Sequence, residues 1–495
     1  MVDPSFQLKA AQFVMDDGLP QKIQFLGPSA VSKKTHITLI AGANGTSKSR
    51  ILASIVDHIC EIEDEHSEQK ISKRYSSSGN HGLSCTWLAA RSSNSEGEKS
   101  PESQQLPSRV LVLSNLVMDR FRFAQNDPDE ESFYQYLGVR QATNLMTTGS
   151  MQRSVSEAVM SLSQSEGKRK LFQKWLELVF GKTKGIALTF DRFSRSEIES
   201  YLAEPDPGKT LEARMVRSMG TRFNDERIHK EAKAAAPKLL ELFKYLLDQG
   251  EGAKAIGKKD SRRNSLVLRL DTLPEKVLAE LANLQAALLS ATRGRFLSWP
   301  SLTVEGKGQS EGQSGWIEFG QLSSGEQNII STGAKLIAHA RPGCLIAIDE
   351  PEVSLNTAWQ QHYTDLVRQS LAQAKGSHVL IATHSPHLIA SLPAGESSVV
   401  LIQKTGDSLA TSTVDADFEG WGSETVLYQV LDVPSASSFK FQRELASVLL
   451  HIQESGRDRN LLDSFLDKAG RLNFEGADTL TDLIGSIKEY RDALE

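Results

Sequence analysis

The chain has 495 residues, too many for one ordinary hydrophobic core and enough for about two to four domains. Hydrophobic residues make up 39% of it and charged residues 24%, the proportions of a soluble globular protein. A formal net charge of −6 argues against a surface built entirely for nucleic acid, although it leaves room for a local basic face.

The cysteines and the amino-terminus predict the compartment. Cys60, Cys85 and Cys344 lie far apart, are odd in number and lack metal-ligand spacing, so we expect reduced thiols. The opening MVDPSFQLKAAQFVMDDG has no basic segment followed by an apolar run, and is therefore no signal peptide. No stretch reaches the roughly 18 apolar residues that span a bilayer. These features predict a cytoplasmic protein with no membrane partner.

The first predicted element is a strand, a glycine-bearing turn and a helix. HITLIAGA at 36–43 is an apolar run typical of a strand buried on both faces of a parallel sheet, and apolar residues of 51–59 share one helical face. Between them, GANGTSKS at 42–49 nearly matches the phosphate loop G-x-x-x-x-G-K-[ST], but Ser47 replaces the second glycine. These eight residues alone fit a nucleotide site and a chance glycine turn about equally well.

A phosphate loop would give each of these residues a role. Backbone N–H groups at the helix N-terminus bind phosphate oxygens, Lys48 reaches the β- and γ-phosphates, and the Ser49 hydroxyl binds Mg²⁺. The predicted nucleotide-binding residues of the loop are Gly42, Asn44, Gly45, Thr46, Ser47, Lys48 and Ser49.

The middle of the chain is predicted to be linkers, one strand and helices. Residues 74–108 and 250–264 are rich in polar residues and contain glycine, as linkers are. RVLVLSN at 109–115 predicts a further strand. Apolar residues at helical spacing predict helices over 226–248, with a break or kink at Pro237, and over 274–293.

Three motifs follow within about 65 residues of one another, as the spacing in the sequence shows. They are GQLSSGEQNIIS at 320–331, GCLIAIDE at 343–350 and HVLIATH at 378–384. Taken singly, each has an ordinary interpretation: a polar loop before a helix, an acidic turn after a strand, and a histidine in a loop. Ligands of parallel sheets bind beyond the carboxyl ends of the strands, which is where every one of these motifs lies.

The pair of acids has a specific chemistry if the site binds a nucleotide. Asp349 would hold Mg²⁺, the metal that Ser49 also binds. Glu350 would face the γ-phosphate and polarise the attacking water as general base. These residues therefore predict Mg²⁺ together with a nucleotide that has a γ-phosphate, and the resemblance below implies that the nucleotide is ATP.

In this order and spacing the motifs resemble those of ABC-type ATPases. The resemblance implies that Ser323 and Gly325 belong to the signature motif, which contacts the γ-phosphate of a nucleotide held by a second protomer. It implies that Asp349 and Glu350 form the Walker B pair with the catalytic glutamate. A homo-oligomer with ATP at the protomer interface follows from it.

The resemblance assigns two further motifs. The D-loop would comprise Glu352, Val353, Ser354 and Leu355. His384 would be the switch histidine, counted with Glu350 as catalytic, and Asn115 would stand in the usual position of the Q-loop glutamine. Ser47 then looks like a tolerated variation in an otherwise complete set.

The details of the motifs are similar to the SMC, RecF and OLD-like branch. LSSGE is followed by glutamine, and 270 residues separate the P-loop from it, which is long enough for an inserted helical lobe. DEPEVSLN, THSPHLI and RVLVLSNLVMDRF resemble ATPases of bacterial anti-phage systems of the Septu and PARIS type. OLD nucleases continue with a Toprim domain, but the strand SVVLIQK lacks its glutamate, and residues 385–495 read as mainly helical.

The expected fold is α/β: an ABC-type P-loop NTPase head with a mostly parallel sheet, an inserted helical lobe and a helical C-terminal region. The predicted boundaries are 1–135 for the first part of the head and 136–298 for a mainly helical insertion. The second part of the head, with signature, Walker B and switch histidine, covers 299–408, and the helical C-terminal region covers 409–495.

Three functions remain open at this level. The first is an ATPase that regulates a separate effector protein, such as a nuclease, in anti-phage defence. The second is a DNA-binding repair or structural ATPase of RecF or SMC type, in which the basic clusters GKRK at 167–170 and KKDSRR at 258–263 contact phosphates. The third is a transporter ATPase, which the long insertion disfavours.

Overall fold

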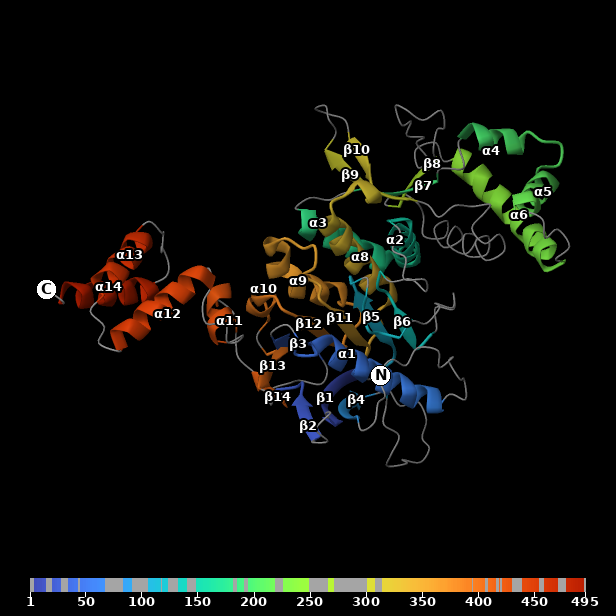
Figure 1. Ribbon diagram of the computed structural model, residues 1–495. Coiled ribbons are helices and arrows are strands. Elements are labelled where there is room, and N and C mark those ends of the chain that lie inside the picture. Colours follow the sequence, from blue (N-terminus) through green and yellow to red (C-terminus); the bar gives the residue numbers. More distant parts are fainter. Residues whose placement is uncertain are drawn as a thin grey trace. The chain divides into compact units, whose positions relative to one another are not determined.

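The computed structural model divides into two compact units, Met1–Trp421 and Gly422–Glu495, shown in Figure 1. The residues that the structure describes are 4–14, 20–27, 34–42, 45–66, 83–90, 106–116, 118–122, 132–139, 148–180, 185–190, 195–218, 226–248, 266–270, 301–307, 314–393, 395–405, 408–414, 418, 421–429, 439–453, 458–470 and 478–493.

A seven-stranded sheet forms the centre of the first unit, in the order β14-β13-β3-β12-β11-β5-β6. All neighbours are parallel except β13 and β14. The strands are β3 (His36–Gly42), β5 (Val110–Ser114), β6 (Tyr134–Tyr136), β11 (Leu345–Asp349), β12 (His378–Thr383), β13 (Ser397–Thr405) and β14 (Ser408–Val414). The predicted α/β fold with a mostly parallel sheet is confirmed, and the four strands predicted from apolar runs are β3, β5, β11 and β12.

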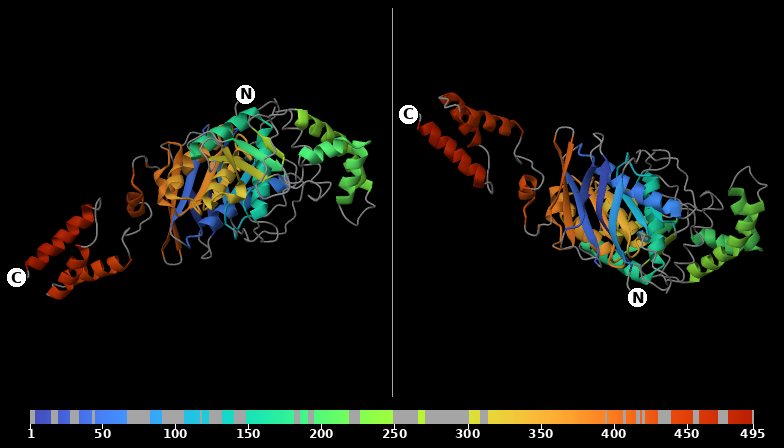
Figure 2. Two further views of the ribbon diagram at one scale, coloured as in Figure 1. Left: turned by 90° about the horizontal axis from the view of Figure 1, so that it is seen from above. Right: turned by 90° about the horizontal axis from the view of Figure 1, so that it is seen from below.

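Both faces of this sheet are covered, which explains why its strands are apolar throughout. Helix α1 (Lys48–His66) packs on one face, and α8 (Ser324–His339), α9 (Thr357–Ser370) and the short α10 (Pro386–Ala390) lie on the other, as the views of Figure 2 show. Leu39, Val112 and Leu380 are fully buried, as members of this core. The packing fixes the loops at the strand ends.

A three-stranded antiparallel sheet, β2-β1-β4, packs on the same side as α1. Its strands are β1 (Ser5–Val14), β2 (Pro20–Gln24) and β4 (Ser84–Ala90). The prediction of a linker over 74–108 is wrong for β4. Cys85 is buried, Trp87 is half-buried, and Thr86 and Leu88 between and after them are exposed. This alternation of period two is a strand signal that the surrounding serine-rich sequence hid.

The predicted insertion contains helices and part of another sheet. The helices are α2 (Thr148–Ser163), α3 (Glu166–Phe180), α4 (Arg195–Leu202), α5 (Pro207–Ser218) and α6 (Glu226–Asp248). The strands β7 (Ile186–Phe190) and β8 (Leu266–Arg269) join β9 (Ser301–Lys307) and β10 (Ser314–Glu318) in the antiparallel order β10-β9-β7-β8, and the short 3-10 helix η1 (Phe319–Gln321) follows. The helix α6 continues through the exposed Pro237, so a helix break there is wrong. The helix predicted over 274–293 lies outside the described residues.

The second unit is helical in its described part, with α11 (Ser423–Gln429), α12 (Phe439–Gln453), α13 (Arg459–Ala469) and α14 (Asp478–Asp492). A small core formed by α12, α13 and α14 holds Val448, Leu462, Phe465, Ala469 and Ile487 together. Residues 409–414, which the sequence assigned to this helical region, form most of β14 instead. SLATSTV is a short run with serine, threonine and valine, which suits an edge strand. None of the described helices is long and apolar enough to cross a membrane.

Candidate nucleotide site

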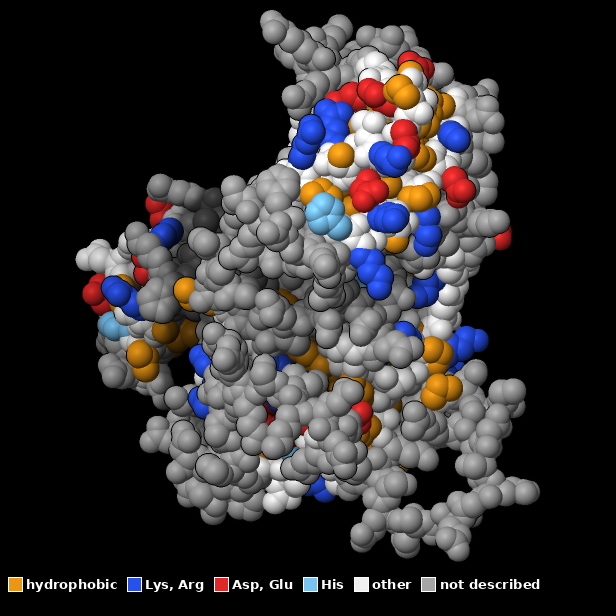
Figure 3. Space-filling view, turned by 90° about the vertical axis from the view of Figure 1, so that its right-hand side faces the viewer, with side chains coloured by type: hydrophobic (Ala, Val, Ile, Leu, Met, Phe, Trp, Pro, Cys, Tyr) orange, Lys and Arg blue, Asp and Glu red, His pale blue; other side chains and the backbone are white. Residues whose placement is uncertain are grey.

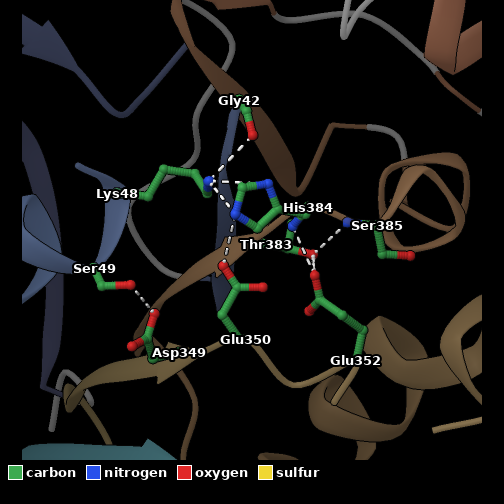
Figure 4. A network of polar contacts seen from close by, with 9 residues as sticks. All are labelled: Gly42, Lys48, Ser49, Asp349, Glu350, Glu352, Thr383, His384 and Ser385. Atoms are coloured by element: carbon green, nitrogen blue, oxygen red, sulfur yellow. Dashed lines mark hydrogen bonds and ion pairs between the residues drawn. The ribbon is translucent and has the colours of Figure 1, made fainter. Parts of the chain in front are cut away.

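Three neighbouring strands end at one place in the sheet. β3 ends at Gly42, β12 at Thr383 and β11 at Asp349, and these strands are parallel neighbours in the order β3-β12-β11. The loops that follow them carry the P-loop, the switch histidine and the Walker B pair. Figure 4 shows the polar side chains of all three loops turned toward one another. The parallel topology thus assembles motifs that lie 300 residues or more apart in the chain.

The P-loop depends on its backbone geometry. A Cβ atom at Gly42 would lie 2.3 Å from the Ile402 carbonyl oxygen, so only glycine fits. Gly45 has φ +85° and Ser47 has φ 63°, both in the left-handed region. Thr46 is buried, and the Ile51 N–H donates to the Ser47 carbonyl oxygen at 2.9 Å, which begins α1. Asn44 lies outside the described residues. Ser47 therefore adopts the conformation for which the usual sequence carries glycine.

We expect Ser47→Gly to stabilise the protein. A residue with a Cβ atom in the left-handed region costs about 1 kcal/mol, and glycine removes that cost. Nucleotide binding is expected to be retained or strengthened, because the backbone N–H groups keep their places. Chemical denaturation and titration with a fluorescent ATP analogue measure the two effects. A sharp loss of affinity would show that the Ser47 hydroxyl contacts the nucleotide directly.

Lys48 and the switch histidine are in contact. The Lys48 ammonium donates to the Gly42 carbonyl oxygen at 3.1 Å and lies 2.7 Å from Nε2 and 3.2 Å from Nδ1 of His384. His384 Nε2 in turn lies 3.2 Å from Glu350 Oε1. One ring nitrogen cannot both accept from lysine and donate to a carboxylate. The consistent arrangement has Nε2–H donating to Glu350 and Nδ1 accepting from Lys48.

The electrostatics separate the two glutamates of this loop. Burial raises the pKa of the Glu350 carboxyl, but the hydrogen bonds with His384 and Glu352 and the charge of Lys48 outweigh burial and leave the pKa below its usual value. Burial and the charge of Glu350 raise the pKa of Glu352 to about 7. Burial lowers the pKa of Lys48, against the attraction of the nearby acids. Near neutral pH, Glu350 is thus the carboxylate available as a base, since divergent pKa values distinguish the acid from the base in such pairs.

The residues predicted to hold the metal are in contact. The Ser49 hydroxyl donates to Asp349 Oδ1 at 2.8 Å, and Asp349 is fully buried. Its second oxygen, Oδ2, has no hydrogen-bond partner among the described residues. A hydroxyl and one carboxylate suit Mg²⁺, which keeps several waters and takes its other ligands from phosphate. The described residues contain no cluster of three or more His, Cys, Asp or Glu that could hold a metal. Ser49 and Asp349 would supply two oxygen ligands to a Mg²⁺ ion that takes the others from water and a nucleotide.

We expect Asp349→Asn to stabilise the nucleotide-free protein and to abolish hydrolysis. Burial raises the pKa of Asp349 to about 6, from 3.8. A raised folded pKa means that its favourable contribution is present below pH 3.8 and is lost as the pH rises through about 6. At pH 7.5 the charge costs on the order of 3 kcal/mol, which asparagine avoids. Chemical denaturation in the presence of a chelator at pH 5 and pH 7.5 measures the free energy of unfolding of both proteins. The increase in Asp349→Asn over the unmodified chain should be larger at pH 7.5.

Backbone strain is concentrated in this site. Among the described residues, the non-glycine residues with positive φ are Ser47 (63°), Glu350 (46°) and Ser354 (71°). They lie in the P-loop, the Walker B pair and the D-loop. The Glu350 N–H donates to the Ala382 carbonyl oxygen at 2.9 Å, which holds the strained turn against β12. Such strain persists where the surroundings over-determine it, and functional sites are where it clusters.

Glu352 makes contacts that the sequence did not predict. Its Oε1 accepts hydrogen bonds from the Thr383 hydroxyl at 2.7 Å and from the His384 N–H at 2.6 Å. The sequence placed Glu352 in the D-loop but gave it no role toward the histidine. The acid in DEPE, two residues after the base, was the available signal.

The signature motif caps a helix. Ser323 is the N-cap of α8 and forms a capping box with Glu326. The Ser323 hydroxyl oxygen accepts a hydrogen bond from the Glu326 backbone N–H, and the Glu326 carboxylate accepts one from the Ser323 backbone N–H. Ser323 is exposed, and no hydrogen bond or ion pair joins it to the P-loop within the described residues. A Cβ atom at Gly325 would lie 2.7 Å from the Ser354 carbonyl oxygen and 3.0 Å from the Trp359 ring. The structure brings the P-loop, Walker B and histidine together but leaves Ser323 outside that cluster.

Asn115 is connected to the D-loop by hydrogen bonds through Asn328, a residue that the sequence analysis did not single out. Its side-chain amide donates to Asn328 Oδ1 at 2.8 Å, and Asn328 on α8 donates to the Val353 carbonyl oxygen at 2.8 Å. Asn328 is 3% exposed. It follows the signature by one turn of helix, where an amide gives no sequence signal of its own.

One family model matches the chain. Residues 222–390 match the family described as "AAA domain, putative AbiEii toxin, Type IV TA system". The match includes Ser323, the Walker B pair and His384, but not the P-loop. No curated protein sequence matches the chain.

Solved structures with some similarity include two SMC heads and a transporter. The Smc head domain of Pyrococcus furiosus, bound to the C-terminal domain of ScpA, is 10% identical, with 83% of this chain and 96% of that chain covered at a TM-score of 0.30. An SmcHead bound to the C-winged helix domain of ScpA is 11% identical, with 82% and 97% covered at a TM-score of 0.27. A metal-chelate type ABC transporter in an inward-facing conformation is 10% identical, with 83% and 97% covered at 0.25.

The chain's own strand order and the family match are the two observations that bear on the fold. The seven-stranded, mostly parallel sheet carries a strand, a phosphate-loop sequence and a helix at its centre. The family match covers the signature motif, the Walker B pair, the D-loop and the switch histidine. Together they support a P-loop NTPase fold for the central sheet and its loops, with residues 222–390 similar to the matched AAA family.

Proposed function

We propose that the chain binds ATP with Mg²⁺ and hydrolyses it in a site that a second protomer completes. The observation that carries this proposal is the contact of Lys48, His384 and Glu350, residues of three separate motifs, at the ends of neighbouring strands. Ser323 of the same chain remains exposed at the start of α8. A helix N-terminus with a free surface suits a phosphate group of a nucleotide held by another copy of the chain.

The side chains divide the chemistry among themselves. Glu350 keeps its charge and accepts a proton from the attacking water, as general base. His384 donates to Glu350 and keeps that carboxylate in place. Lys48 exchanges its contacts with Gly42 and His384 for the phosphates. A Mg²⁺ ion bound with the nucleotide, held by Ser49 and Asp349, would offset the charge that develops on the phosphate oxygens.

The energy of this cycle is proposed to regulate a separate effector, such as a nuclease, in defence against phage. The family matched over residues 222–390 is described as a toxin of a type IV toxin–antitoxin system, which favours a role in defence. The chain also carries a second compact unit, Gly422–Glu495, helical in its described part, and we propose that such a partner binds there. The partner's identity is the next thing to determine by co-purification from the native host.

The alternative, a DNA-binding repair or structural ATPase, receives less support from the charges. In the basic cluster at 167–170, Lys168 donates to the Ala338 carbonyl oxygen at 2.7 Å and Lys170 pairs with Glu166 at 2.5 Å. The cluster at 258–263 lies outside the described residues. On the one face that Figure 3 draws, the coloured Lys and Arg side chains are interspersed with Asp and Glu rather than gathered in one basic stripe. An interspersed surface is poor at binding phosphate backbones.

A mixing experiment tests the shared site. Lys48→Ala loses the P-loop lysine, and Ser323→Arg blocks the signature, so each protein alone should be inactive. In a mixed dimer one site pairs the intact Lys48 of one chain with the intact Ser323 of the other, and the second site carries both changes. We expect mixing to restore part of the ATPase activity, provided that one site can turn over alone. A chain that hydrolyses ATP by itself gives no recovery on mixing.

A further inference from the structure

The D-loop (352–355) is held by side chains on two sides. On one side, Asn328 of α8 donates to the Val353 carbonyl oxygen at 2.8 Å and reaches the Pro351 carbonyl oxygen at 3.5 Å. On the other side, Glu352 accepts from Thr383 and from the His384 N–H. The loop therefore lies between the helix that begins with the signature and the strand that ends at the switch histidine.

Three of these hydrogen bonds are 2.6 to 2.8 Å long and partly buried, and they start from the buried residues Asn328 and Thr383 and from the His384 N–H. Asn328 is 3% exposed, and its Oδ1 is fixed by the Asn115 amide at 2.8 Å. Thr383 is fully buried, and its hydroxyl donates to Glu352 while it accepts from the Ser385 N–H at 2.9 Å. Buried hydrogen bonds of this kind specify one geometry, because each unpaired group would be costly.

A second link runs beside the first. The Gln360 amide donates to the Leu355 carbonyl oxygen at 2.9 Å, and the Ser385 hydroxyl donates to Gln360 at 2.7 Å. The end of the D-loop is thus also connected to the residue that follows the switch histidine. The D-loop itself contains the strained Ser354, whose carbonyl oxygen lies against Gly325 of the signature. A displacement of α8 would therefore move the D-loop as well.

We propose that Glu352 and Asn328 are positioning residues that hold the D-loop between the signature helix and His384, so that engagement of the signature sets the placement of His384 in the same chain's own site. This inference rests on the proposed function, since the engagement comes from a nucleotide held by a second protomer. Asn328 forms its hydrogen bonds with Asn115, Thr332 and the D-loop backbone, whereas Glu352 also shares a hydrogen bond with the Glu350 side chain. Glu352 acts through the backbone and hydroxyl of 383–384, and Asn328 acts through the carbonyl groups of the D-loop.

The first test measures where His384 is held, without nucleotide. Its side chain is 33% exposed, so it is open to carbethoxylation by diethylpyrocarbonate, and peptide mass spectrometry gives the rate for this one residue. We expect Glu352→Ala to raise the rate about fivefold, because the loop loses both hydrogen bonds to the D-loop. The rate in Glu352→Gln should stay close to that of the unmodified chain, because an amide oxygen accepts the same two hydrogen bonds.

Matched controls separate positioning from a general loss of structure. Glu396 is a partly exposed glutamate at the start of β13 that pairs with Lys34 at 2.6 Å, and Glu396→Ala should not change the rate at His384. Asn328→Ala should raise the rate although Asn328 does not contact His384. Ser331→Ala, a buried change on the same helix, should not. If Glu352→Ala does not fold, Thr383→Val takes its place: it removes one of the two donors to Glu352, together with the acceptor of the Ser385 N–H, with little change of shape.

The second test is turnover. Glu352→Ala is expected to lower kcat about thirtyfold and to change the affinity for ATP less than threefold, because a misplaced catalytic group affects the reaction more than binding. Glu352→Gln is expected to recover most of that loss. Unchanged carbethoxylation of His384 in Glu352→Ala and Asn328→Ala would overturn the inference while ATP turnover of the unmodified chain stands. An unmodified chain without turnover would contradict the proposed function, and the carbethoxylation rates would still decide the inference.

Discussion

Replacement of Glu350 by glutamine is expected to lower ATP turnover by about a hundredfold or more, because a general base contributes on that scale. ATP affinity should stay within about threefold, since Lys48, Ser49 and Asp349 remain in place. The structure supports Glu350 as the base: its pKa lies below the usual value, while that of Glu352 is raised to about 7. Release of phosphate under single-turnover conditions, together with titration of a fluorescent ATP analogue, measures both effects.

Glu352→Gln provides the matched control for this change. Both variants replace a glutamate of the same loop by its amide, and at neutral pH Glu352 already carries much of a proton. Its amide should therefore cost far less turnover than the amide at 350. Hydrolysis by Glu350→Gln at the rate of the unmodified chain would show that another group is the base.

Replacement of Lys48 by alanine is expected to remove detectable nucleotide binding, a loss of about a hundredfold or more in affinity. Lys48 is 4% exposed, and its ammonium contacts Gly42 and His384 beside the P-loop. It is thus placed to meet the phosphates with little loss of side-chain entropy. Titration with the same fluorescent ATP analogue in the presence of Mg²⁺ measures the loss.

The stability of the Lys48→Ala protein without nucleotide separates lost binding from misfolding. Burial lowers the pKa of Lys48, so the buried charge is not a source of stability. We expect an unfolding midpoint equal to or above that of the unmodified chain. Retained tight binding by a folded Lys48→Ala protein would contradict the assignment of this loop as the phosphate site.

The sequence was sufficient for the central sheet because its signals were strong and local. Strands buried on both faces are apolar runs, and β3, β5, β11 and β12 were recognisable on that basis. The parallel arrangement then required that their ends meet, which placed Lys48 near Asp349 and His384. The outer strands carry weaker signals. β4 alternates within a serine-rich segment, and β14 is a short edge strand with polar residues.

The missing parts of the site are those that depend on tertiary contacts. Ser47 was visible as a departure from the motif, but only the fold shows that it has a positive φ and carries backbone strain. Asn328 and Glu352 are ordinary residues in sequence, and their importance comes from partners 25 to 32 residues away. No periodicity reports such pairs. Binding of a second protomer likewise depends on the shape and chemistry of the folded surface, which a sequence pattern does not report.

The oligomeric state of Glu350→Gln with ATP tests the shared site most directly. Sedimentation velocity compares this protein with Mg²⁺ and ATP, with Mg²⁺ and ADP, and without nucleotide. If ATP joins Lys48 of one protomer to Ser323 of another, the ATP sample contains a species of at least twice the 54.4 kDa of one chain. ADP lacks the γ-phosphate and should not produce it, and Ser323→Arg in the same protein should abolish it. A strictly monomeric mass at saturating ATP, with specific activity of the unmodified chain independent of its concentration, would contradict the account.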